Sequence, residues 1–224
     1  MKRSEVNEAI EYALKMLEEN QLFLPSFGYW TAGEWATRKD HLDNMRKVML
    51  GWDVTDFGQN NYMQTGAVLF TIRNGSLDGK AGTPYAEKLI FLRHSTEQQL
   101  PHHFHTQKTE DIINRGGGIL CLQLYNSLPD GRLDQENHVR VLMDGLWKII
   151  PPGQTVEISR GSSITIHPGL YHRFWAKKGC GDLILGEVSS INNDLTDNTF
   201  LDAGVRFSVI EEDEPAKYLL CNEY

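Results

Sequence analysis

The sequence has little that would suit a membrane, a secretion pathway or a nucleic acid. Its longest purely apolar stretch, near Gly66 to Phe70, is far below the roughly 20 residues that cross a bilayer, and residues 1–20 lack the apolar core of a secretion signal. Basic residues number 22 against 30 acidic ones, a formal net charge of −8, and no basic cluster is long enough to neutralise a run of phosphates. We therefore expect a cytoplasmic location and no nucleic-acid or membrane partner.

Cysteine is scarce, and repeats and low-complexity tracts are missing. Cys121, Cys180 and Cys221 are widely separated and have no CxxC spacing, so we expect reduced thiols rather than disulfides or a zinc site. Apolar residues make up 40% and charged residues 23% of the 224 residues, which is typical of a globular protein. Because no linker interrupts the chain, we expect one domain over residues 1–224.

Two helices are predicted at the N-terminus. Ser4 is a plausible N-cap for a helix over residues 4–20, since Val6 and Ile10 begin an apolar stripe at helical spacing. Thr31 and Glu34 have the spacing of a capping box, which predicts a second helix extending to about residue 49.

From residue 66 the sequence pattern changes to short apolar runs separated by tight-turn dipeptides such as Asn-Gly and Asp-Gly. Many short strands without helices between them favour an antiparallel sandwich or jelly-roll barrel over a parallel βαβ fold. We predict a mainly β fold, with a helical extension over about residues 1–60 and a β-barrel over about residues 61–224.

Five of the eight histidines fall in the two windows PHHFHTQKTE and HPGLYH. In a strand, His103 and His105 share a face while His102 points away. Glu110 follows after a turn, which can bring its carboxylate back beside the two histidines. His172 is the fourth candidate ligand. Three imidazoles and a carboxylate suit Mn²⁺, Fe²⁺, Co²⁺, Ni²⁺ or Zn²⁺ and leave coordination positions open for a substrate.

These residues match a family pattern. HFHTQKTEDIINRGG resembles the first cupin motif, and Gly161, Gly169 and His172 match the second in register. The sequence departs from the motifs where Glu97 replaces a glycine, His167 a proline and Ala176 an asparagine, but the four ligand positions are intact.

Longer blocks narrow the resemblance. MLGWDVTDFG, LFTIRNG, PYAEK, HPGLYHRFWA and GEVSSINND, with the first cupin motif, resemble the cupin-type D-lyxose isomerases over nearly the whole chain. The resemblance implies a cupin jelly-roll barrel, a homodimer and a divalent metal, typically manganese. It also implies interconversion of D-lyxose with D-xylulose, and of D-mannose with D-fructose.

Aldose–ketose isomerisation by way of an enediol needs a base that moves a proton between C1 and C2. Glu187 is the preferred candidate, because it ends the run DLILGEV on the face of Leu183 and Leu185, where it would be partly desolvated. Lys88 shares a face with Ala86 and Ile90 and could donate to a sugar oxygen inside the barrel. A rim or salt-bridge role for Glu187 and a solvated edge-strand position for Lys88 stay open.

Three further residues are candidate substrate contacts. Lys108 matches the family block, although its turn leaves its direction open. Asp194 belongs to a polar cluster with Asn192, Asn193, Asp197 and Asn198 that could bind hydroxyl groups or form Asx turns. Arg206 is opposite in phase to its apolar neighbours and could lie on an inner strand face. Gly116, Gly117 and Gly118 are expected to be structural, permitting a bulge or a close backbone approach.

The residues leave other functions open. A cupin dioxygenase or decarboxylase would use the same ligand set, and oxygen uptake or CO₂ release would reveal either. A sugar-sensing cupin of a transcription regulator is disfavoured by the acidic charge. An isomerase of sugar phosphates would need cationic phosphate contacts, for which four residues are available: Lys88, Lys108, Arg115 and Arg206.

Overall fold

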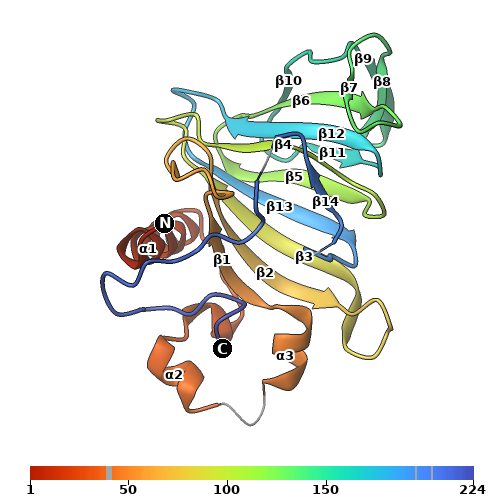
Figure 1. Ribbon diagram of the computed structural model, residues 1–224. Helices are drawn as coiled ribbons and strands as arrows, with labels where there is room; N and C mark the ends of the chain where they lie inside the picture. The colour runs from red at the N-terminus through yellow and green to blue at the C-terminus, as the bar shows by residue number, and fades with distance from the viewer. Residues whose placement is uncertain (39–41, 195, 203) are drawn as a thin grey trace.

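The computed structural model describes residues 1–38, 42–194, 196–202 and 204–224. Its strands form two antiparallel sheets, with the orders β1-β2-β3-β13-β5-β11-β8-β9 and β10-β6-β12-β4-β14, and β7 pairs with β6 (Figure 1). In chain order the strands are β1 (Gly51–Thr55), β2 (Ala67–Gly75), β3 (Gly82–Leu92), β4 (Gln99–His105), β5 (Glu110–Gly117), β6 (Leu120–Ser127), β7 (Leu133–Asp134), β8 (Val139–Met143), β9 (Leu146–Ile150), β10 (Val156–Ile158), β11 (Ser163–Ile166), β12 (Leu170–Ala176), β13 (Leu183–Ser190) and β14 (Asn198–Phe200). The predicted mainly β fold of antiparallel sheets, with helices at the N-terminus, is confirmed.

The first predicted helix is α1 (Arg3–Glu19), but its N-cap is Lys2 and not Ser4. Ser4 lies in the first turn, where its hydroxyl donates a hydrogen bond of 2.6 Å to Asp213. The N-cap prediction was wrong because the C-terminal segment, distant in sequence, engages this side chain.

The second predicted helix is divided. The capping box of Thr31 and Glu34 opens α2 (Ala32–Ala36), and a separate helix α3 (Asp43–Val48) follows, with a 3₁₀ turn η1 (Ser26–Tyr29) before both. Residues 39–41, within the predicted helix, lie outside the described residues. The first strand begins at Gly51, so the strands start earlier than the expected boundary near residue 60.

Alternate residues of the first strands face two different cores. Leu69 and Ile90 pack between the two sheets, whereas Phe70 and Phe91 pack on the outer side beneath α1. A sheet buried on both faces needs continuous apolar runs, which explains blocks such as GAVLFTI. Polar side chains on the inner face of this sheet are therefore shielded from water, and they must find polar partners among themselves.

The C-terminal segment, residues 204–224, runs back past β1 towards α1 (Figure 1). The backbone NH of Cys221 donates to the Trp52 carbonyl at 2.7 Å, and the hydroxyl of Thr55 donates to the Arg206 carbonyl at 3.0 Å. This segment is irregular at Arg206, so the expectation of a strand there was wrong. Packing beside β1 nevertheless brings Arg206 to the interior.

The three cysteines are free, as predicted. In the part of the chain that the structure describes, no helix has the length and apolar character needed to cross a bilayer.

Candidate active site

Three histidines converge from two neighbouring strands. Strand β4 carries His103 and His105 on its inner side, and β12 pairs with β4 so that His172 lies opposite His103. The three rings are buried, and one ring nitrogen of each lies within 4.8 Å of the others. The predicted alternation also holds for His102, whose ring lies beside Tyr125 instead, at 5.6 Å between centroids.

The backbone fixes how these rings are oriented. The Nδ1 atoms of His103, His105 and His172 lie 2.9, 3.2 and 3.0 Å from the carbonyl oxygens of Pro101, Asp197 and Leu170. A carbonyl can only accept, so each Nδ1 carries the hydrogen and each Nε2 offers a lone pair. The Nε2 atoms of His105 and His172 are buried and make no hydrogen bond within the described residues, which is how metal-binding imidazoles are presented.

Burial keeps the rings of His103 and His105 in the form that binds metal. It lowers the pKa of His103 well below its usual value, and the neighbouring His172 and His105 lower it further. Burial likewise lowers the pKa of His105, and Lys108 adds to the effect. Neutral imidazole is the metal ligand. The three-histidine cluster could therefore bind a metal ion.

Glu110 opens β5 and faces the same cluster. Its Oε1 lies 3.1 Å from Nε2 of His172, and its Oε2 lies 3.6 Å from Nε2 of His105. Burial alone would raise the pKa of Glu110, but the charge of Lys108 and the contact with His105 outweigh it and hold that pKa well below its usual range. Glu110 is therefore an ionised carboxylate within reach of an ion that the histidines hold.

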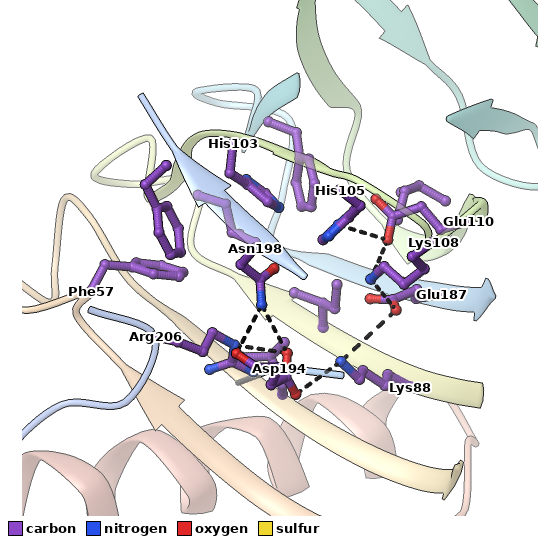
Figure 2. A pocket seen from close by; sticks show the side chains of 16 residues that line it. Phe57, Lys88, His103, His105, Lys108, Glu110, Glu187, Asp194, Asn198 and Arg206 are labelled. Atoms are coloured by element: carbon purple, nitrogen blue, oxygen red, sulfur yellow. Dashed lines mark hydrogen bonds and ion pairs between the residues drawn. The ribbon is translucent and has the colours of Figure 1, made fainter. Parts of the chain in front are cut away.

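A chain of alternating charges leads away from Glu110 (Figure 2). The Lys108 ammonium lies 2.6 Å from Glu110 and 3.0 Å from Glu187. Glu187 lies 3.9 Å from Lys88, its cross-strand neighbour on β3, and Lys88 lies 3.5 Å from Asp194. Lys108 thus bridges two carboxylates and is buried.

The chain continues at the other end of the cavity. Arg206 lies 3.0 Å from Asp194 through Nε and 2.5 Å from Asp53 through Nη1. Counting from Glu110, the series holds four carboxylates and three cations, a net charge of −1 when the histidines are neutral. A divalent cation would reverse the sign of this charge, so the donor set fits a metal in both charge and ligand type.

Two groups of this network, Lys108 and Asp194, have pKa values shifted in the direction that pairing requires. Burial alone would lower the pKa of Lys108, but Glu110 and Glu187 raise it above its usual value. Burial opposes ionisation of Asp194 as well, but Arg206, Lys88 and Lys108 hold the pKa of that carboxyl far below its usual range. Lys108 and Asp194 therefore stay charged at neutral pH.

The cavity lies between the two sheets. The histidines come from the six-stranded sheet, whereas Lys88, Glu110 and Glu187 come from the eight-stranded sheet, and Lys108 lies in the loop that joins β4 to β5. Of the nine predicted site residues, eight line this cavity, and His172 lies directly behind His103 with 4.1 Å between the ring centroids. The remaining lining is largely apolar and includes Phe57, Leu69, Ile90, Leu100 and Phe200.

Sequence reasoning named Asn192 and Asn198 only as members of a polar cluster, and it missed Asp53. Asn192 accepts from Lys108 at 3.3 Å and donates to Asp194 at 2.7 Å, and Asn198 lines the cavity from β14. The polar cluster around Asp194 was the available signal for both. Asp53 gave no such signal, because it lay in a segment assigned to the helical extension.

Comparison with known proteins finds relatives similar in sequence and in fold. The model of the D-lyxose isomerase family matches residues 1–224. The chain is 41% identical over 226 residues to a D-lyxose/D-mannose isomerase of Escherichia coli O157:H7, and 40% identical over 227 residues to one of Serratia proteamaculans. Each match covers 100% of this chain and 98% of the relative. The L-ribose isomerase of Acinetobacter sp. DL28 in complex with L-ribose is similar in fold, with a TM-score of 0.62 at 15% identity over 94% of this chain and 98% of that one.

Proposed function

Because the chain belongs to the D-lyxose isomerase family and is an aldose–ketose isomerase, we propose that it interconverts D-lyxose with D-xylulose, and D-mannose with D-fructose, using a bound divalent metal. The observation that carries this proposal is the cluster of three buried histidines. Nε2 of His105 and of His172 has no hydrogen-bond partner among the described residues, and the chain of charged side chains lies beside the cluster. The names of the two relatives support both sugar pairs.

His103, His105, His172 and Glu110 would hold the metal, which we propose is Mn²⁺. Fe²⁺, Co²⁺, Ni²⁺ and Zn²⁺ suit the same ligands. When bound, the cation polarises the sugar carbonyl and offsets negative charge that develops on its oxygen. Because the imidazole orientations are fixed by backbone carbonyls, binding the ion would need little rearrangement.

Glu187 is the proposed base. Its carboxylate is buried on the cavity wall, with the hydroxyl of Ser189 at 3.4 Å and the ammonium of Lys108 at 3.0 Å. It would take the proton from the carbon next to the carbonyl and return it to the neighbouring carbon. Lys108 lies between this base and Glu110, so its ammonium can donate to a sugar oxygen while the proton moves.

The sugar hydroxyls would be bound further along the cavity. Lys88, Asp194 and Arg206 offer donors and acceptors there, and Phe57 and Phe200 give an apolar surface for the C–H face of the sugar. The cationic side chains of the cavity, Lys88, Lys108 and Arg206, are each already paired with at least one carboxylate. The pairing favours a neutral sugar over a sugar phosphate, whose charge would have to displace those partners.

Proton NMR of D-lyxose and D-mannose in D₂O with Mn²⁺-loaded protein tests the proposal. We expect ketose to form with deuterium at its C1, and deuterium to enter C2 of the aldose through the reverse reaction. Ketose without deuterium would favour a hydride shift or a shielded proton over exchange through Glu187. No ketose from either sugar would refute the activity, and oxygen uptake or CO₂ release would then identify a cupin dioxygenase or decarboxylase.

The variant Glu187→Gln separates the base from the metal site. We expect it to retain the metal and lose at least about 100-fold in kcat, in line with the usual contribution of a general base. Metal content by mass spectrometry and kcat are measured on the same sample. Full activity in the variant would remove Glu187 as the base.

We further propose a homodimer in the cytoplasm acting on free monosaccharides. The family resemblance supports this assembly, and light scattering after size-exclusion chromatography tests it.

A further inference from the structure

Asp53 is a buried carboxylate that the reaction outlined above does not use. It lies on β1, and only 3% of its surface is exposed. Its strand neighbours Trp52 and Val54 pack in the outer core beneath α1, whereas Asp53 lies on the other side of the strand. Burying an ionised carboxylate is unfavourable unless it is paired, so the partner of Asp53 indicates its role.

That partner is Arg206. Its Nη1 lies 2.5 Å from Oδ2 of Asp53, and neither atom has a hydrogen-bond partner among the described residues, so the two groups form an ion pair. Burial raises the pKa of the Asp53 carboxyl, and the guanidinium of Arg206 opposes that rise. The pair joins the first strand of the sheet to the irregular C-terminal segment.

Arg206 also contacts a second carboxylate, Asp194, through its Nε at 3.0 Å. Guanidinium groups pair most strongly when both oxygens of one carboxylate accept in parallel. Such a fork would also engage Oδ2 of Asp194, which instead accepts from the Asn192 amide. The ion pair with Asp53 turns Nη1 the other way, so Arg206 meets Asp194 through one nitrogen only.

The other carboxylate oxygen of Asp194, Oδ2, has two polar partners. Its Oδ2 accepts from the Asn192 amide at 2.7 Å and lies 3.5 Å from the Lys88 ammonium. Asp194 lines the cavity at the end away from the histidines (Figure 2). A sugar whose carbonyl end lies at the histidines would therefore present its far hydroxyl groups to Asp194 and Arg206.

We propose that Asp53 is a positioning residue that holds Arg206 in a single-nitrogen contact with Asp194 and so keeps this end of the cavity ready for the far hydroxyl groups of the sugar. The inference rests on the proposed isomerase function. Asp53 acts through Arg206 and touches neither the reacting carbons nor the metal ligands. Its loss should weaken sugar binding much more than it slows the chemical step.

The test compares Asp53→Asn with Asp56→Asn. Asp56 is also buried and also anchors the C-terminal segment, through the hydroxyl of Ser208 at 2.5 Å, but it does not contact Arg206. For Asp53→Asn we expect KM for D-lyxose to rise about tenfold, the usual effect when a ligand loses one hydrogen bond to a charged group. We expect kcat to stay within about twofold of the parent value. For Asp56→Asn we expect KM to stay unchanged.

A double variant gives an independent check. Because Asp53 acts through Arg206, adding Asp53→Asn to Arg206→Lys should raise KM much less than it does in the parent. Additive effects, an unchanged KM in Asp53→Asn, or an equal KM change in Asp56→Asn would each overturn the proposal.

One readout does not depend on turnover. The ¹⁵N NMR signal of Arg206 Nε, assigned by its loss in Arg206→Lys, should shift in Asp53→Asn and stay in place in Asp56→Asn. If the parent protein converts no aldose, the isomerase function fails, yet the position of this signal still decides whether Asp53 holds Arg206. An unmoved signal overturns the role of Asp53 alone.

Discussion

Asp197 ties the loop between the candidate metal ligands to β14, and Asp197→Asn should damage both stability and the site. Its carboxylate accepts from the backbone NH groups of Thr106, Gln107 and Lys108, each at 3.0 Å, and from the Thr106 hydroxyl at 2.6 Å. Its backbone carbonyl also lies 3.2 Å from Nδ1 of His105. One residue therefore shapes the loop that carries Lys108.

The magnitude follows from these contacts. An asparagine places its NH₂ group against either the Lys108 NH or the donors at the other oxygen, so at least one buried donor loses its acceptor, which costs about 1–3 kcal/mol. The remaining bonds lose their charge, and a total loss of about 3 kcal/mol is expected. For a chain of this size each kcal/mol lowers Tm by about 2–4 °C, so Tm should fall by about 6–12 °C. A shift of Lys108 by about 1 Å should lower kcat about 10–100-fold.

Thermal unfolding and steady-state kinetics measure these effects, with Asp134→Asn as the matched control. Asp134 accepts from the backbone NH groups of Glu136 and Asn137 at 3.0 Å and from the Asn137 amide at 2.8 Å, but it does not line the cavity. The control should lower Tm and leave kcat unchanged. If Asp197→Asn lowers Tm and leaves kcat at the parent value, the placement of Lys108 does not depend on Asp197 and the reasoning is wrong.

The same variant has a defined pH dependence. Burial alone would raise the pKa of Asp197, but the Thr106 hydroxyl and the loop NH groups outweigh it and lower that pKa below its usual value. A carboxyl whose pKa is lower in the folded state stabilises the protein above its unfolded pKa of about 3.9, and this stabilisation is lost as the pH falls. The Tm difference between the parent and Asp197→Asn should therefore be full at pH 6 and shrink towards pH 3. A difference that stays constant would contradict the lowered pKa.

Three further predictions concern the metal cluster and the barrel. His172→Ala should leave less than about a tenth of the parent's bound Mn²⁺ by mass spectrometry, and full retention would exclude His172 as a ligand. Because burial lowers the pKa of His103 and His105, Mn²⁺ affinity measured by calorimetry should change little between pH 7 and pH 6, whereas a fall of tenfold or more would indicate ordinary imidazole pKa values. Gly117→Ala should destabilise the fold by about 3 kcal/mol in urea unfolding, because a Cβ there would lie 1.7 Å from the Asp182 carbonyl oxygen at a φ of +84°. An unchanged midpoint would refute that clash.

The sequence predicted best where strand alternation alone decides direction. His103 and His105 lie inward and His102 outward, and Glu187 lies on the face of Leu183 and Leu185. Lys88 is buried because β3 lies between β2 and β13 and is not an edge strand. These positions follow from a period of two and need no knowledge of distant contacts.

Side chains outside the strands were less predictable. The direction of Lys108 depends on Asp197, a residue 89 positions away in the chain. Arg206 does reach the cavity, but from an irregular segment held by Thr55 and not from a strand. Glu97, which replaces a motif glycine, retains the left-handed conformation at a φ of 52°. For Lys108 and Arg206, tertiary contacts decide the conformation, and the local sequence pattern does not reveal them.

The C-terminal segment determines when the cavity can be completed during synthesis. Translation delivers the histidines, Glu110 and Glu187 before Arg206, because Arg206 comes later in the chain. A nascent chain that has formed its sheets therefore carries Asp53 and Asp194 as two carboxylates without the guanidinium that joins them. Docking of the last segment against β1 cancels that repulsion, so we expect it to be the step that converts a folded barrel into one able to hold a sugar.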